Sequence, residues 1–406
     1  MTTGTSQAST STASLAYKEE TAFGVVASGA PKLLRHTGES LAYSFTQAES
    51  AELNASGQVA DAVITDASAS GGFNFEAQYK EFDPFIEALL RNTFSSFGTG
   101  GVKTLTVTFA KTAGTITGTT GDFTGLVAGQ WFRVAESDTT DNNDGLYLIK
   151  TVTSSVITVD PETPLLADKT SDTGVEISST RITNGTATMR TFSIEKSFAD
   201  VAQFFMHRGR GISAMSLSFA TGAILTGSFT TMGKDVTRAD ATQFSTSASA
   251  AEAFGISSCV TGVGNILVRN AAGASILGGA YIQAATVNID GKLREQKALS
   301  NLGAIGLGKG TFSMTGTLEV YLKTGSIYDA ALADQLISVS IPVKDAYGNG
   351  YAYTFANVKL NVPDVMAGAK DQDVLMSVPF TAVAPNTTVD RMIAIDRFGA
   401  SVVVAT

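Results

Sequence analysis

The chain has 406 residues, a formal net charge of −9 and only 16% charged residues, against about 25% in an ordinary soluble domain. Two interpretations of this shortage stay open: much of the surface meets other protein, or a large β-rich core carries a surface of Ser, Thr and Gly. The acidic balance argues against a protein that clamps nucleic-acid phosphates, because such proteins present basic surfaces. The single cysteine, Cys259, excludes a disulfide framework and a thiolate metal cluster within one chain.

The N-terminal sequence "MTTGTSQASTSTAS" has neither the basic nor the apolar region of a signal peptide. We expect residues 1–14 to be flexible, and we expect the protein to be made in the cytoplasm without export. No apolar run approaches the roughly 20 residues that a transmembrane helix requires. We therefore expect no membrane partner.

The first strongly patterned segment, residues 71–90, reads "GGFNFEAQYKEFDPFIEALL". Apolar and polar residues alternate at its start, which predicts a strand with one buried face. Asp83, followed by Pro84, has the position of a helix N-cap, so a short helix is expected to follow and to pack back on the sheet. The apolar faces are Phe73, Phe75, Ala77 and Tyr79 in the strand, and Phe85, Ala88 and Leu89 in the helix.

Residues 98–184 interrupt this pattern with short strand candidates separated by turn residues. The candidates are "TLTVTFAK", "GTITGTT", "GQWFRVAES", "DGLYLIKTVT", "SSVITVD" and "GVEISS". Their spacing predicts a small closed or nearly closed β-barrel. The only tryptophan, Trp131, belongs to this segment and is predicted to lie in its core. A hairpin is expected at residues 212–230, and the small, polar residues that follow indicate a linker.

A similar strand-plus-helix pattern returns at residues 310–333, "GTFSMTGTLEVYLKTGSIYDAALA". Ser326 is the expected N-cap, with Asp329 three residues later in a capping-box arrangement. The apolar faces are Phe312, Met314, Gly316, Leu318 and Val320 in the strand, and Ile327, Ala330 and Ala331 in the helix.

The flanks of the two patterns also match. Each pattern follows a long irregular loop, at residues 47–70 and 291–309, and each precedes a hairpin, at residues 212–230 and 337–355. We therefore predict a mainly β fold with two tandem β-sandwich or barrel domains, each with a short flanking helix, plus the inserted barrel. The expected boundaries are 15–97 with 185–237 for the first domain, 98–184 for the barrel, 238–262 for the linker and 263–406 for the second domain.

No catalytic, cofactor or metal site is predicted. His36 and His207 are the only histidines and lie far apart in sequence, whereas a catalytic triad needs a base held by a third group. His207 follows a helix-like run and is expected to cap its end. Carboxylates such as Asp334 and Asp345 form no evident acid and base pair.

Two loops resemble ligand-binding motifs only in part. "GAIGLGKG", residues 303–310, has Gly where a phosphate loop needs Ser or Thr, and it leads into a strand instead of a helix. We expect it to be a flexible loop in an assembly contact. "DTTDNNDG", residues 138–145, lacks the ligand register of an EF-hand, so a solvated turn is expected.

The order of these segments resembles the tail tube, or major tail, proteins of bacteriophages with long non-contractile tails. The resemblance spans about residues 15–383 and is carried by "GGFNFEAQY", "DPFIEALL", "TFSIEKSFAD" and "SAMSLSFATGAILTGSFTTMG". Residues 120–159 are similar to a small β-module that such proteins often carry. The resemblance implies stacked rings around a DNA channel, with residues 47–70 and 291–309 as loops that contact neighbouring copies.

Single-domain members of that family form hexameric rings, so two domains in one chain imply a trimer with pseudo-sixfold symmetry, or a hexamer if the duplication is illusory. The barrel is expected to face outward, and other tail proteins are expected at the tube ends. An acidic channel would repel DNA and let it pass without specific binding. The implied location is the virion tail, assembled in the host cytoplasm.

Three alternatives remain open. A tandem β-domain surface adhesin or layer protein shares the Thr, Gly and Ser composition but needs an export signal. A hydrolase on a β-scaffold is disfavoured by the two histidines. A tube subunit of a contractile or type VI secretion system shares the ancestral fold of the resembled family.

Overall fold

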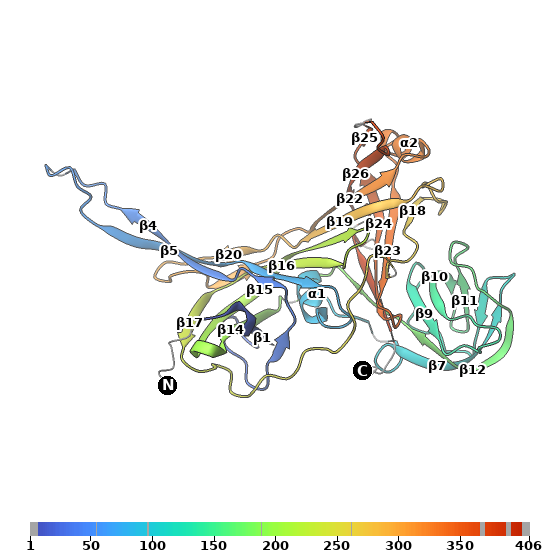
Figure 1. The fold of residues 1–406 in the computed structure, drawn as a ribbon, viewed down its shortest axis with the longest axis horizontal. Coiled ribbons are helices and arrows are strands. Elements are labelled where there is room, and N and C mark those ends of the chain that lie inside the picture. The colour runs from blue at the N-terminus through green and yellow to red at the C-terminus, as the bar shows by residue number, and fades with distance from the viewer. Residues whose placement is uncertain are drawn as a thin grey trace.

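The computed structural model describes residues 7–53, 55–95, 97–187, 189–260, 262–365, 370–386 and 391–399. The fold is mainly β, as predicted. Figure 1 shows a body from which a long hairpin projects, an upright part beside it, and a separate barrel at the end opposite the hairpin. We call the described residues 7–260 outside the barrel the first half, and residues 262–399 the second half.

A sheet of antiparallel strands crosses from one half to the other, and we call it the central sheet. In spatial order its strands are β6 (Gly72–Glu76), β16 (Thr226–Met232), β15 (Gln203–Ala220), β19 (Ile282–Asp290), β22 (Ser313–Tyr321) and β26 (Leu375–Ala382). The halves meet where β15 pairs with β19, from Ala214 opposite Asp290 to Ala220 opposite Ala284. Because side chains alternate along a strand, apolar residues gather on one face of this sheet and polar residues on the other.

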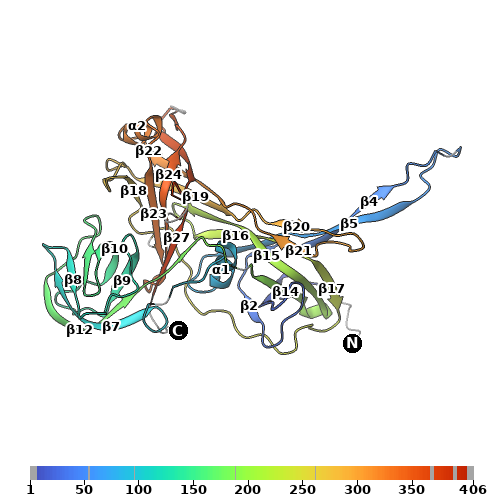
Figure 2. The ribbon, with the colours of Figure 1, turned by 180° about the vertical axis from the view of Figure 1, so that it is seen from behind.

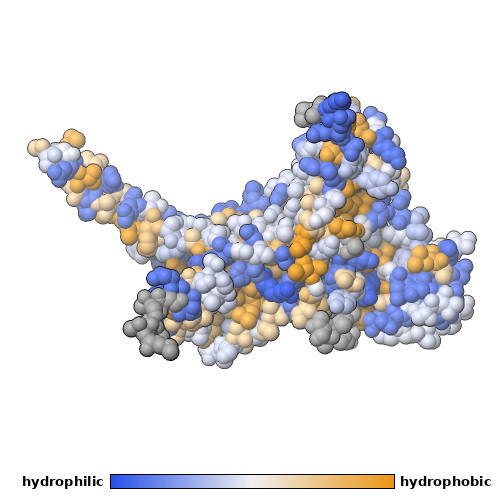
Figure 3. Space-filling view, in the orientation of Figure 1, coloured by the Kyte–Doolittle hydropathy of each residue, from blue (hydrophilic) through white to orange (hydrophobic). Residues whose placement is uncertain are grey.

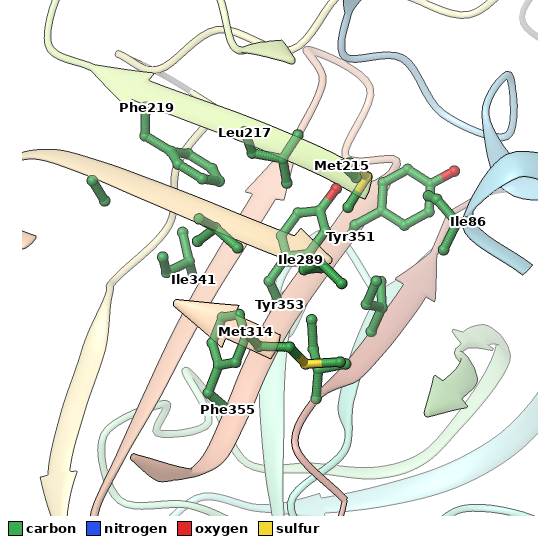
Figure 4. Close-up of a cluster of buried hydrophobic side chains, with 14 of the residues drawn as sticks. Ile86, Met215, Leu217, Phe219, Ile289, Met314, Ile341, Tyr351, Tyr353 and Phe355 are labelled. Carbon is green, nitrogen blue, oxygen red and sulfur yellow. The ribbon is translucent and has the colours of Figure 1, made fainter. Parts of the chain in front are cut away.

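The core lies between the apolar face of the central sheet and a second layer. In the first half this layer contains α1 (Asp83–Leu90), β1 (Ala13–Glu19) and β14 (Thr191–Phe198); in the second half it contains β23 (Ile337–Lys344) and β24 (Gly350–Leu360). Figure 4 shows side chains from the two layers together, including Leu217, Phe219 and Ile289 beside Ile341, Tyr353 and Phe355. The predicted buried faces of the two strand-plus-helix patterns are confirmed, for the buried residues include Phe73, Phe75, Phe85, Leu89, Met314, Leu318 and Ile327.

The two halves repeat one strand order. In the first half β1, β14, β15, β16 and β6 are neighbours in that order; in the second half β18 (Leu267–Asn270), β23, β24, β26 and β22 are. The N-terminal parts of β15 and β24 pair with β17 (Asp235–Ala239) and β27 (Ala394–Phe398) respectively. A helix follows β6 in one half and β22 in the other, where α2 spans Ser326–Leu332. These repeated connections support the predicted duplication, while its residue boundaries stay a prediction.

Short elements complete the sheet edges. β2 (Lys32–Leu34) pairs with β1, β3 (Gly38–Glu39) with β6, and β25 (Asp364–Val365) with β26. Thr10–Thr12 form a 3-10 turn before β1. Ala13 and Ser14, which the sequence analysis assigned to a flexible N-terminus, belong to β1 and lie opposite Phe198 and Ser197.

The two segments expected to be irregular loops, 47–70 and 291–309, are largely hairpins. β4 (Ala42–Glu49) and β5 (Ala62–Ser70) form the projecting hairpin, which we call arm 1. β20 (Arg294–Gln296) and β21 (Gly306–Gly308) form a shorter one, arm 2, which includes part of the "GAIGLGKG" segment. Figure 2 shows arm 2 beside the base of arm 1. Residues 62–65 of β5 are exposed on both faces, so no alternation of polarity marks this part of the arm as a strand.

Both predicted helix caps are wrong by one residue. α1 begins at Asp83, with Phe82 at the N-cap, and α2 begins at Ser326, with Gly325 at the N-cap; neither cap residue donates or accepts a side-chain capping bond. The Asp83 carboxylate is instead engaged by the second half, through Tyr351 and Arg397. A distant charged partner has outweighed the local capping pattern.

The helix expected before His207 is also wrong. Only Ala199–Val201 form a 3-10 turn, and Gln203–Ala220 form the long strand β15. β15 has β14 on one edge and β17 on the other along this stretch. Hydrogen bonds to these two neighbouring strands hold the backbone of β15 in the extended form. The spacing of the apolar residues alone fits a helix and gives no sign of these partners.

The inserted barrel is confirmed. Its six strands close in the order β10, β11, β8, β7, β12, β9. They are β7 (Val102–Ala110), β8 (Thr115–Thr117), β9 (Trp131–Ala135), β10 (Gly145–Val152), β11 (Val156–Val159) and β12 (Lys169–Ser178). Phe132 and Val134 of β9 lie in the barrel's own core.

Trp131 does not lie in that core, which corrects the prediction. Because Phe132 and Val134 point inward, their neighbour Trp131 points out of the barrel. It is buried with Leu267, Ala352 and Phe398 of the second half, and its Nε1 donates to Ser340 Oγ at 2.7 Å. Trp131 therefore packs the barrel against the second half.

The last strand, β27, connects all three parts of the molecule. It pairs with β24 of the second half and with β13 (Thr180–Thr183), which follows the barrel directly. Asp396 of β27 is fully buried; it accepts bonds from Arg181 Nε and Nη2 at 2.6 and 2.8 Å and from the Trp131 backbone N–H at 2.9 Å. The barrel is thus fixed to the body by a strand, a buried ion pair and a tryptophan.

Candidate functional surface

The polar face of the central sheet is a continuous surface of small hydroxyl and amide side chains. One row crosses all six strands: Asn74, Ser228, Ser216, Asn288, Thr315 and Thr381. The neighbouring row is Glu76, Thr226, Ser218, Thr286, Thr317 and Pro379. The hydroxyls of Ser216 and Ser228 lie 2.8 Å apart, and residues of both rows line a shallow groove with Thr37.

Few charges stand on this face, and those that do are mostly acidic. The carboxylates are Glu76, Asp290, Glu319 and, on the edge strand β25, Asp364. Asp290 pairs with Lys292 at 2.7 Å. Among the described residues aligned on the face, Lys359 is the one basic side chain, opposite Thr381 at the far edge, and it pairs with Asp334. Such a face offers no cluster of cations to hold a phosphate backbone.

Arm 1 is anchored at its root by a buried arginine. Arg210 is 0% exposed. Its guanidinium donates to the carbonyls of Ser70 and Ala42, at 2.8 and 3.0 Å, and these are the two residues paired at the base of the arm. Burial lowers the pKa of Arg210 to about 10, which leaves it charged at neutral pH. The arm therefore leaves the body in a fixed direction.

His207 completes this anchor. Its Nδ1 lies 2.7 Å from Nη2 of Arg210 and must accept that hydrogen bond, because a guanidinium only donates. Burial, and then the Arg210 charge, lower the pKa of His207 to about 3. The imidazole is therefore neutral at physiological pH.

Arm 2 is anchored by an arginine of the other half. Arg91, at the C-terminal end of α1, donates to the carbonyls of Gly310, at 2.9 Å, and Gly291. These carbonyls lie on either side of the arm 2 hairpin. Lys297 of arm 2 also pairs with Asp66 of arm 1, so the two arms are linked to each other as well as to the body.

The acidic residues that were weighed as ligands or catalytic groups take part in ion pairs and in turn hydrogen bonds. Asp138 and Asp141 of the acidic turn pair with Lys169, at 2.9 and 3.7 Å. Asp345 accepts backbone N–H bonds from Tyr347 and Asn349 and so shapes the β23–β24 turn. Among the described residues, no group of three His, Cys, Asp or Glu side chains is placed to hold a metal ion.

Sequence reasoning missed the residues that fix the arms. "GRG", residues 209–211, is too short to count as a dinucleotide-binding fingerprint, and Arg91 stands in no motif. Their partners are main-chain carbonyls far away in the chain, which carry no sequence signature. The one available signal was an arginine between glycines within an apolar strand.

The observations so far define a β-structured protein built around a continuous, mostly uncharged sheet face and projecting arms. A family model described as phage tail tube protein matches residues 10–382, and the chain belongs to this family. It is a family of structural proteins of the virion tail. No curated protein matches the chain. None of the helices in the described residues is long and apolar enough to span a membrane.

Proposed function

We propose that this protein is the tube subunit of a long non-contractile phage tail, and that it self-assembles into stacked rings that enclose a channel for DNA. The observation that carries the proposal is the polar face of the central sheet, which runs without interruption through both halves. Membership of the tail tube family supports it. Assembly takes place in the host cytoplasm, and other tail proteins bind the tube ends.

The ring is a trimer in which six half-chains are related by pseudo-sixfold symmetry. Within one chain the halves are joined by the β15–β19 ladder, and in the shared strand order β24 corresponds to β15 and β3 to β19. Among the described residues, β3 pairs only with β6, and β24 beyond Val358 pairs only with β26. Open edges such as these are a liability unless they are covered, and a closed ring covers both. A hexamer of chains is the alternative.

The polar face of the central sheet lines the channel. Hydroxyl and amide groups keep the wall wet, and the carboxylates Glu76 and Glu319 repel the phosphates of passing DNA. A wall of lysines would retain the DNA by counterion release. DNA therefore slides through without specific binding.

The arms and the barrel have different places in the proposed tube: arm 1 extends toward the next ring, and the barrel lies on the outer surface. Arm 1 carries exposed apolar side chains along its length, namely Phe45, Val63 and Ile64, and Figure 3 shows hydrophobic residues among hydrophilic ones there. These are suited to contact with the next ring. The barrel faces outward, because a module of this bulk does not fit in the channel or between rings.

Negative-stain electron microscopy of the purified protein, with sedimentation velocity over a range of concentrations, tests the proposal. Rings or tubes with a central hole, and a subunit count of three per ring, support it. Six chains per ring would replace the trimer with the hexamer. Dispersed monomers at high concentration would overturn the proposal and favour an adhesin or layer protein.

A further inference from the structure

Helix α1 is enclosed by both halves of the chain. Tyr351 of β24 donates from its hydroxyl to Asp83 Oδ1 at 2.6 Å, and Arg397 of β27 pairs with the same carboxylate. At the other end of the helix, Arg91 binds the Gly291 and Gly310 carbonyls. Figure 4 shows Ile86 of α1 at the same core cluster as Met215 and Tyr351. The second half thus closes over a helix that belongs to the first.

Helix α2, the counterpart of α1, has no such cover among the described residues. Its Ile327, Ala330 and Ala331 are buried, at the spacing of Phe85, Ala88 and Leu89 in α1. The next matching positions are Leu90, which is 0% exposed, and Leu332, which is 61% exposed. Leu322, just before α2, is also exposed. The side of α2 that corresponds to the enclosed side of α1 is open and apolar.

The first half has an open surface that corresponds to the β23–β24 region of the second half, in which Tyr351, the cross-strand partner of Val343, contacts α1. A bulge interrupts the β14–β15 ladder between Phe192 and Ile194, and a matching bulge interrupts the β23–β24 ladder between Ile337 and Val339. When residues are counted from these bulges, Val343 and Tyr353 of the second half correspond to Phe198 and Phe205 of the first.

Burial differs sharply between these matched residues. Val343 and Tyr353 are 2% and 4% exposed, and Tyr353 packs its ring against Phe219 of β15. Phe198 and Phe205 are only half-buried, and their rings meet edge to face at a centroid distance of 6.3 Å. Lys196, beside them in β14, pairs with Glu39 at 3.0 Å. The two aromatic rings therefore form an apolar surface with a charged rim, and among the described residues no aromatic side chain covers it as Phe219 covers Tyr353.

We propose that α2 of one chain docks on the Phe198–Phe205 surface of a second copy, and so repeats between chains the contact that encloses α1 within a chain. This inference rests on the proposed ring, because each closed ring must join a second half to the first half of the next chain. We assign a second copy as the occupant because one chain contains both surfaces of the contact. They are covered by each other at α1, and their counterparts, α2 and the Phe198–Phe205 surface, are uncovered in the described part of the chain.

The proposal is tested with a pair of matched leucine variants. Leu332→Glu places a charge on the docking side of α2, and Leu166→Glu places one on the barrel, where Leu166 is 57% exposed against 61% for Leu332. Both side chains are exposed, so both variants should fold with unchanged circular dichroism. We expect Leu332→Glu to raise the concentration needed for ring formation about tenfold or more, because a buried leucine is lost and a charge desolvated. Leu166→Glu should assemble like the parent.

Cross-linking between copies provides the second measurement. In a Cys259→Ser background, Tyr328→Cys and Phe205→Cys are made in separate chains, and the chains are mixed and treated with a short bismaleimide. A covalent dimer should form with this pair and not when Val127→Cys on the barrel replaces Phe205→Cys. If the parent protein forms rings but the pair does not cross-link and Leu332→Glu assembles normally, the docking proposal is overturned while the ring stands. If the parent forms no rings, the proposed function itself fails.

Discussion

Arg210 and His207 show how single residues stabilise a projecting element from inside the body. A fully buried guanidinium is costly to desolvate, and this cost is offset only when its donors find acceptors. Here two of the acceptors are the carbonyls of Ala42 and Ser70, at the first pair of arm 1, and a third is His207. In the shared strand order the residue that matches Arg210 is Val358, whose apolar side chain donates no hydrogen bond. Arm 2 is held instead by Arg91 of the first half.

The neutral state of His207 predicts a pH-dependent stability. Its pKa is about 3 in the folded protein and about 6.5 in the unfolded chain. Because the folded pKa is the lower one, the unfolded chain binds the extra proton. The stabilisation is complete above about pH 6.5 and is lost as the pH falls toward 3, at up to about 1.4 kcal/mol per pH unit.

His207→Gln should remove this slope, because the amide oxygen still accepts from Arg210 and does not titrate. The measurement is the free energy of unfolding in urea between pH 7 and pH 5, above the range in which most carboxylates titrate. The parent should lose stability over this range, and the variant should lose clearly less. Equal slopes for the two proteins would show that His207 is not the group responsible.

At the scale of elements, what the sequence could reveal depended on whether a strand has a buried face. The strands at Phe73 and Met314 were predicted because alternate side chains enter the core. β5 lies within the segment predicted as a loop, because its outer residues, from Ala62 to Thr65, are exposed on both faces. β15 was taken for a helix around His207 because the apolar spacing there fits both periods, and only its partners β14 and β17 decide between them.

The alternation of polar residues can be read from the sequence for each strand of the central sheet. That these strands join into one continuous polar face cannot be predicted in this way. Ser216 and Asn288 lie in different halves and are neighbours only through the β15–β19 register. The open edges could not be predicted for the same reason: an edge is defined by the strand that is missing beside it. They lead to a prediction about assembly.

Val362, two residues after β24, lies at the edge that the proposed ring pairs with β3 of the next chain. It is 48% exposed, and Val127 on the barrel, at 46%, is a matched control. We expect Val362→Glu to keep the stability of the monomer within about 0.5 kcal/mol and to weaken assembly on the order of tenfold or more, because a carboxylate would be desolvated at the joint. Sedimentation velocity measures this effect. Val127→Glu should assemble normally, and equal assembly of both variants would contradict the pairing of these edges.

At the scale of the whole molecule, the barrel has a hydrophobic core of its own and is nevertheless fixed to the body. Its interior residues form one cluster, and Trp131 belongs to another that it shares with the second half. Arg269 of the second half also pairs with Asp160 of the barrel at 2.7 Å, and Arg181 pairs with Asp396. The sequence predicted the barrel from six local patterns, but these joints link residues more than a hundred positions apart, and no local pattern announces them.

Trp131→Ala should therefore release the barrel without unfolding it. The substitution removes the side chain that fills the joint and the Nε1 bond to Ser340, a loss of about 3–5 kcal/mol for a buried tryptophan. The barrel keeps its own core, because Phe132 and Val134 are untouched. Small-angle scattering should show a larger radius of gyration, and limited proteolysis should cut first at the connections near residues 97–101 and 179.

Two controls distinguish release of the barrel from general instability. Trp131→Phe keeps most of the packing and loses only the Nε1 donor, so it should cost about 1 kcal/mol and leave the scattering curve unchanged. Phe132→Ala opens a cavity inside the barrel and should produce cuts within residues 102–178. If Trp131→Ala gave the same internal cuts, Trp131 would support the barrel fold itself; if its scattering matched the parent, the ion pairs and β27 would be sufficient to hold the barrel in place.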